Sequence, residues 1–130
     1  MALAVQPRTF DVGGVLLERP FKIRRLGHFG YNSLNPEACL PFYTELLGFR
    51  LSDELRRDPQ GAASGYFMRY GTDHHAFVLI REMPGAARRM PDVTVNQITW
   101  QVGSLREVVS AAGWLKERGV PLQRTGRDMP

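Results

Sequence analysis

The amino-acid sequence predicts an α+β fold built from βαβββ units, because a strand–helix–strand pattern occurs twice along the chain. The first copy begins with a strand at residues 26–32, which an amphipathic helix follows. The second copy begins with a strand at residues 95–101, and its helix ends at Gly119. Self-similarity of this kind indicates two related supersecondary units on one shared sheet.

His28 and Gln97 occupy matching positions in the two copies. Because side chains alternate across a strand, both can lie on the concave face of the shared sheet. A metal or ligand site between two half-domains is expected at such a pair of positions.

A turn and a proline delimit an element that precedes the first unit. Residues 11–14 read as a turn, and residues 15–18 read as a short strand that Pro20 ends. The sequence therefore predicts a leading strand within residues 10–20.

The first βαβββ unit is predicted to span residues 24–81. Its opening strand, residues 24–33, places Phe29 and Tyr31 on the face opposite His28. Three further strands are predicted, at residues 49–55, 65–70 and 74–81.

The helix of the first unit has clear start and stop signals. Asn35 is its expected N-cap, Pro36 takes the first helical position and Gly48 ends it. Pro41 removes a backbone hydrogen bond inside the helix and should kink it. The apolar residues at helical spacing make one apolar stripe, formed by Cys39, Phe42, Tyr43, Leu46 and Leu47.

The second unit, residues 95–130, follows a polar linker at residues 82–94 and is incomplete. Ser104 caps its helix, and residues 120–124 can begin one more strand. A full unit would need two more strands, and their absence leaves an open sheet edge. The leading strand, a second copy of the chain in a dimer, or further sequence would have to fill it.

Composition excludes several classes of protein. The 130 residues, of which 43% are hydrophobic, suit one globular domain, and no apolar run approaches a bilayer-spanning length. The chain is expected to be cytoplasmic, and its single cysteine, Cys39, is expected to be a buried thiol. The net charge of +4 comes from scattered arginine pairs, which disfavours nucleic acid as a partner and is compatible with an anionic small molecule.

Four segments together resemble the vicinal oxygen chelate superfamily, which includes glyoxalases, bleomycin-resistance proteins and dioxygenases. They are RLGHFGY at 25–31, FYTELLGF at 42–49, GTDHHAFVL at 71–79 and NQITWQVGSL at 96–105. Within the superfamily they most resemble the catalytic half of type I extradiol ring-cleaving dioxygenases. The resemblance implies a cup-shaped mixed sheet and a metal-dependent enzyme that cleaves a catechol-type aromatic diol.

The resemblance also implies a metal site. Extradiol cleavage uses a divalent ion, here expected to be Fe(II), with Mn(II) or another divalent ion as the alternative. The family holds it with two histidines and one carboxylate. His28 matches the first ligand, and Gln97 lies where the second histidine belongs. Each also has a simpler interpretation. His28 would then be an ordinary polar strand residue, and Gln97 would be an amide bonded to a neighbouring strand.

The third ligand of the family, a late glutamate, has no counterpart in the 130 residues. Glu18 has a suitable local pattern, DVGGVLLE at residues 11–18, but belongs to the preceding strand. It is a candidate carboxylate if that strand replaces the missing one, and otherwise a surface residue.

His75 matches the acid–base histidine of the family's His-His pair, and His74 is expected to point the other way. Two exposed turn histidines are the alternative. Because Gln97 departs from the dioxygenase pattern, two other functions stay open. One is a glyoxalase- or epimerase-like lyase or isomerase, and the other is a metal-free binding protein of the bleomycin-resistance type.

Overall fold

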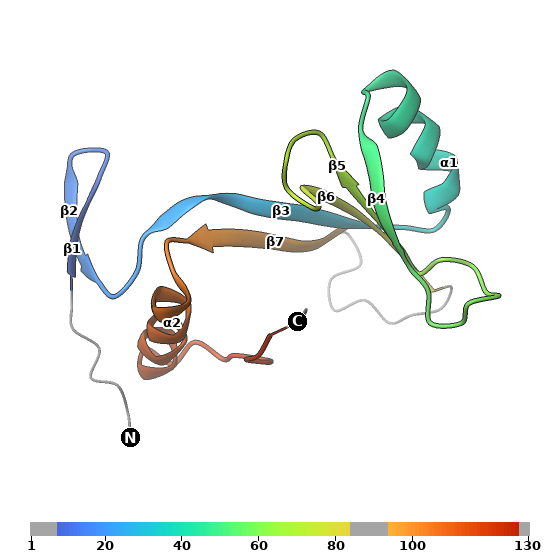
Figure 1. Cartoon of the computed structure of the whole chain (residues 1–130). Coiled ribbons are helices and arrows are strands. Elements are labelled where there is room, and N and C mark those ends of the chain that lie inside the picture. Colours follow the sequence, from blue (N-terminus) through green and yellow to red (C-terminus); the bar gives the residue numbers. More distant parts are fainter. Residues whose placement is uncertain (1–7, 84–93, 128–130) are drawn as a thin grey trace. The chain divides into compact units, whose positions relative to one another are not determined.

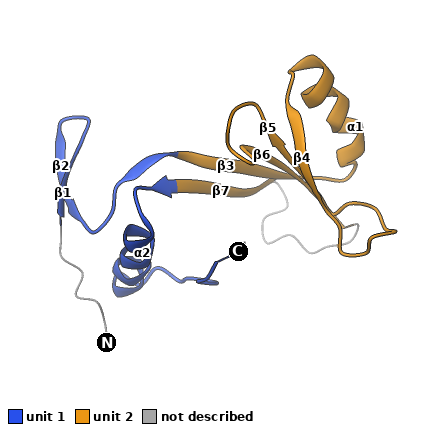
Figure 2. Cartoon of the chain, in the orientation of Figure 1, with its two compact units in different colours: residues 1–25, 101–130 blue, residues 26–100 orange. Residues whose placement is uncertain are grey.

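The computed structural model describes residues 8–83 and 94–127 of the chain. The chain divides into two compact units, coloured separately in Figure 2. Unit 2 contains residues 26–100, and unit 1 combines the residues before and after this stretch. None of the helices among the described residues is long and apolar enough to cross a membrane.

Unit 2 has the predicted βαβββ order, which confirms the α+β class (Figure 1). Its elements are β3 (Ile23–Ser33), α1 (Pro36–Pro41), the π-helix η1 (Phe42–Leu46), β4 (Arg50–Leu55), β5 (Gly65–Arg69) and β6 (Phe77–Arg81). With β7 (Val95–Val102), its strands form a five-stranded mixed sheet in the order β4-β5-β6-β3-β7. β5 is antiparallel to β4 and β6, whereas β3 and β6 are parallel.

The core of unit 2 lies between the helical segment and one face of the sheet. Its buried side chains come mainly from β5 and β6, and they are Ala63, Tyr66, Met68, Phe77 and Leu79. Phe29 and Tyr31 of β3 pack against them, as the alternation of that strand predicts. His28 therefore lies on the opposite face of β3, away from this core.

Pro41 interrupts the helix of unit 2, as expected. The α-helical part ends at Pro41, and the chain continues as a π-helix in which the Leu47 amide donates to the Phe42 carbonyl over 3.1 Å. The predicted stripe is only partly buried. Tyr43 packs on the core, but Phe42 and Leu46 are exposed. The wider turn after the proline rotates these side chains out of the register that regular 3.6-residue spacing would give.

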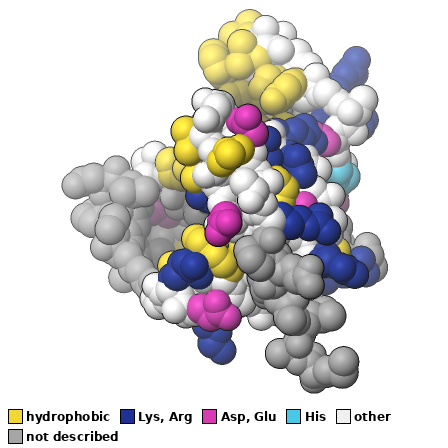
Figure 3. Space-filling model, turned by 90° about the vertical axis from the view of Figure 1, so that its left-hand side faces the viewer, with side chains coloured by type: hydrophobic (Ala, Val, Ile, Leu, Met, Phe, Trp, Pro, Cys, Tyr) yellow, Lys and Arg dark blue, Asp and Glu magenta, His cyan; other side chains and the backbone are white. Residues whose placement is uncertain are grey.

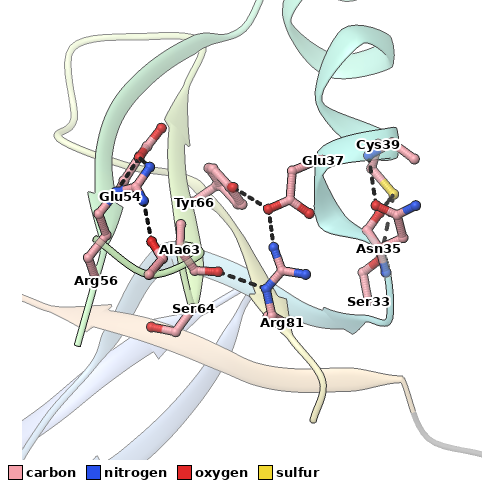
Figure 4. A network of polar contacts seen from close by, with 12 residues as sticks. Ser33, Asn35, Glu37, Cys39, Glu54, Arg56, Ala63, Ser64, Tyr66 and Arg81 are labelled. Atoms are coloured by element: carbon pink, nitrogen blue, oxygen red, sulfur yellow. Dashed lines mark hydrogen bonds and ion pairs between the residues drawn. The ribbon is translucent and has the colours of Figure 1, made fainter. Parts of the chain in front are cut away.

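A polar network connects α1 to the sheet (Figure 4). The Glu37 carboxylate accepts a 2.5 Å hydrogen bond from the Tyr66 hydroxyl and forms an ion pair with Arg81. The Arg81 Nε also donates to the Ala63 carbonyl over 2.9 Å. The Tyr66 hydrogen bond and the Arg81 charge hold the pKa of Glu37 below its ordinary value. Strands β5 and β6 are thereby tied to the start of the helix.

Unit 1 contains a hairpin of β1 (Arg8–Val12) and β2 (Val15–Arg19), which includes the predicted leading strand. Its two-residue turn has Gly13 at φ 60° and Gly14 at φ 85°, the conformation that a type I′ turn requires.

Unit 1 also contains α2 (Leu105–Glu117). Ser104 caps this helix as expected, accepting from the Glu107 amide over 3.2 Å.

Cys39, in unit 2, is half-buried rather than buried.

Two predicted strands differ from the structure. β6 begins at Phe77 rather than His74, because residues 71–74 form a bend before the ladder starts. Residues 120–127 form no strand, since no neighbouring strand pairs with them among the described residues. Most of the predicted linker, residues 84–93, lies outside the described residues.

Candidate functional site

The candidate site begins with the contact between β3 and β7. Gly27 lies against Thr99, and Gly30 lies against Gln97, so the two strands run in opposite directions. A Cβ at Gly27 would be 3.1 Å from the Thr99 carbonyl oxygen, and one at Gly30 would be 3.2 Å from the Gln97 Cγ. Glycine at position 27 lets β7 lie close to β3, because a Cβ there would crowd the Thr99 backbone, and glycine at position 30 leaves room for the Gln97 side chain.

Two polar side chains of β7 converge on one imidazole nitrogen of β3. The His28 Nε2 lies 2.6 Å from the Gln97 side-chain nitrogen and 2.9 Å from the Thr99 hydroxyl. With the amide and the hydroxyl as donors, the Nε2 accepts and the ring proton of His28 lies on Nδ1. The lone pair that a metal ion would use is therefore hydrogen-bonded within the protein.

His75 lies beside this group. Its ring centroid is 4.5 Å from that of His28 and 4.9 Å from that of Phe67, and its Nδ1 is 2.9 Å from the His74 Nδ1. Burial lowers the pKa of both His28 and His75, and the charges of His28 and His74 lower that of His75 further. Both rings are consequently neutral at pH 7, which is the form that binds metals or accepts a proton.

The structure brings three predicted site residues together, namely His28, Gln97 and His75. His74 does not point away from His75 as expected, because both precede the regular strand and their rings are hydrogen-bonded. Thr99 was not predicted, although its spacing of two residues from Gln97 places it on the same face of β7.

Metal ligation is incomplete within the described part of the chain. Residues 8–83 and 94–127 contain no group of three or more His, Cys, Asp or Glu side chains that could hold a metal ion. His28 and Gln97 supply one imidazole and one amide, which do not make up the two-histidine, one-carboxylate set. Glu18 lies on β2 in unit 1, whereas His28 lies in unit 2. The role of Glu18 as a carboxylate ligand therefore stays a prediction.

The fold and this cluster point to one superfamily, and comparison with known proteins agrees. Residues 25–130 match the Glyoxalase/Bleomycin resistance protein/Dioxygenase superfamily, so the chain belongs to that family. The resemblance to the vicinal oxygen chelate superfamily stated from the sequence is thus confirmed.

Among individual proteins, the chain is 29% identical over 104 residues to the biphenyl-2,3-diol 1,2-dioxygenase of Paraburkholderia xenovorans. This match covers 78% of the chain and 33% of that enzyme, so the chain spans about a third of the relative's length.

Two solved structures share the fold. The 2,2',3-trihydroxybiphenyl 1,2-dioxygenase of Sphingomonas wittichii matches with a TM-score of 0.63 and 22% identity, over 94% of this chain and 47% of that one. The Mn(II)-bound glyoxalase of Novosphingobium aromaticivorans matches with a TM-score of 0.59 and 23% identity, over 75% of this chain and 27% of that one.

Proposed function

We propose that this chain forms part of an extradiol dioxygenase-like enzyme that acts on a catechol-type aromatic diol. The observation that carries the proposal is the convergence of His28, His75, Gln97 and Thr99 on one face of the sheet. The similarity to a dioxygenase of an aromatic diol supports this substrate class.

The side chains of the cluster suit the binding of such a diol. The Gln97 amide and the Thr99 hydroxyl can hydrogen-bond a phenolic oxygen, and Phe67 offers an aromatic surface beside His75. His75 is the proposed acid–base group, because a neutral imidazole can take a phenolic proton and later return it. These residues would bind and orient the substrate and hold its proton.

Ring cleavage also requires a divalent metal ion, which polarises the diol and brings it together with dioxygen. We propose that His28 and Gln97 face this ion, Fe(II) or Mn(II). The described residues contain no group of three or more His, Cys, Asp or Glu side chains that could complete the site. The carboxylate would come from Glu18, from other sequence or from a second copy of the chain.

The proposal is tested on anaerobically purified protein by metal analysis and by oxygen uptake with catechol. We expect bound iron or manganese in the wild type, loss of the metal in His28→Ala, and retention of the metal in His75→Ala. Catechol-dependent oxygen uptake should fall in both variants. Metal without oxygen uptake would overturn the dioxygenase assignment and favour the glyoxalase- or epimerase-like alternative, which Gln97 supports as a neutral oxygen ligand.

A metal-free binding protein is the other candidate, because Gln97 and Thr99 already occupy the His28 Nε2. This candidate predicts that catechol binds with the same affinity after dialysis against a chelator. Absence of metal together with retained binding would replace the enzyme proposal by this one.

A further inference from the structure

The three histidines of the chain form a continuous row of rings: His74, His75 and His28. The His74 and His75 rings are nearly perpendicular, with centroids 5.2 Å apart and their Nδ1 atoms 2.9 Å apart. Neighbouring residues in a regular strand point to opposite faces and could not make this contact. The bend at residues 71–74, which precedes β6, therefore makes the pair possible.

The backbone just after the pair is firmly anchored. The Ala76 amide donates to the Met68 carbonyl over 2.9 Å, and the Ala76 carbonyl accepts from the Phe29 amide over 3.1 Å. The His75 ring also packs with its edge toward Phe67. These contacts determine where the His75 ring lies, but ring packing does not determine which of its nitrogens carries the proton.

The hydrogen bond with His74 links the position of that proton to the tautomer of His74. A neutral imidazole has one N–H donor and one acceptor nitrogen, so two Nδ1 atoms can share a hydrogen bond only if one ring is protonated on Nδ1 and the other on Nε2. The pair thus links the tautomer of His75 to that of His74. This constraint holds whenever both rings are neutral.

We propose that His74 is a positioning residue that holds His75 in a single tautomer, opposite to its own. Because the Nδ1 of His75 is bonded to His74, its Nε2 then has one defined role, as donor or as acceptor. The consequence for acid–base chemistry rests on the proposed function, whereas the tautomer itself does not. In this way His74, the more exposed of the two histidines, acts on the site through its neighbour.

Nuclear magnetic resonance of imidazole nitrogens tests the proposal without substrate or metal. With ¹⁵N-labelled histidine only three rings contribute, and the spectrum is recorded at about pH 8, above the ordinary imidazole pKa of about 6.5. We expect the His74 and His75 rings to show opposite tautomers, one protonated on Nδ1 and the other on Nε2. Two rings with the same tautomer in the wild type would overturn the proposal.

Two variants of nearly equal shape separate the hydrogen bond from packing. In His74→Leu the partner is absent, and the two nitrogen signals of His75 should move toward a common average as both tautomers become populated. In His74→Asn a polar atom returns near the place of Nδ1, and the signals of His75 should separate again. The signals of His28 report whether each variant is folded.

An unchanged His75 spectrum in His74→Leu would overturn the proposal, whatever the enzyme activity. Conversely, a changed spectrum in a protein without catechol-dependent oxygen uptake would support the tautomer assignment and reject the proposed function. The failure of the tautomer proposal and the failure of the proposed function are therefore distinguishable.

Discussion

At the scale of single residues, Gln97 decides the chemistry of the candidate site. Its side-chain nitrogen lies 2.6 Å from the His28 Nε2, and its position in the sequence is the one where the family resemblance places a second histidine ligand. A neutral amide is a poorer ligand for iron than an imidazole is. The amide instead hydrogen-bonds His28, and it leaves the described residues without a full ligand set.

Gln97→His should therefore create a stronger metal site. We expect Fe(II) and Mn(II) to bind roughly tenfold more tightly or better, a gain of at least about 1.4 kcal/mol, because two imidazoles would face the ion. Anaerobic titration calorimetry measures the Kd. In the double variant His28→Ala with Gln97→His the gain should disappear. If the gain persists there, the new histidine binds metal without His28.

At the scale of elements, Glu107 connects α2 with the chain before β3. Its side chain is buried, at 7% exposure, and accepts from the Gly103 amide over 3.1 Å and from the Lys22 amide over 3.2 Å. Arg24 lies 3.7 Å from the same carboxylate. The Gly103 hydrogen bond, then the Lys22 hydrogen bond and the Arg24 charge lower the pKa of Glu107, which burial by itself would raise. One carboxylate thus attaches the start of the helix to the rest of unit 1.

Glu107→Gln should destabilise unit 1 by about 2 kcal/mol at pH 7, since a charged acceptor of two amides is replaced by a neutral one. Because the folded pKa is lowered, this contribution is present above the ordinary glutamate pKa of about 4.5 and is lost as the pH falls through the lowered value. Urea unfolding at pH 7 and in steps below pH about 4.5 should show the two proteins converging in acid. A constant difference across this range would contradict the pKa assignment.

At the scale of the whole molecule, large apolar side chains remain on the surface (Figure 3). Leu46 is 76% exposed, Leu105 is 72% exposed and Trp100 is 55% exposed. They belong to the π-helix, to α2 and to the edge strand β7. Burying a side chain of this kind contributes roughly 1.5–3 kcal/mol, so a partner surface that covered these side chains would gain stability from each of them.

We therefore expect the chain to self-associate, in keeping with the dimer predicted from its open sheet edge. Sedimentation velocity over a dilution series should show a mass above that of the monomer, which decreases on dilution. Leu105→Ser and Trp100→Ser, measured separately, indicate which unit makes the contact. A monomer at every concentration would contradict the expectation.

The sequence by itself determined the local elements. Gly13 and Gly14 specified a turn, Ser104 a helix start and Pro41 an interruption, because each acts through its own backbone geometry or hydrogen bonds within a few residues. Strand alternation also placed Phe29 and Tyr31 in the core and left His28 on the other face. The match between the two copies then indicated that His28 and Gln97 would meet.

Only the tertiary structure decided what depends on contacts between distant segments. It paired His74 with His75 because β6 begins three residues later than the apolar pattern suggested, and it brought Thr99 to His28 from a strand 71 residues away. It also left residues 120–127 without a strand partner among the described residues and exposed three of the five residues of the helical stripe. Such outcomes depend on which surfaces compete for burial and backbone pairing, and local propensity does not encode that competition.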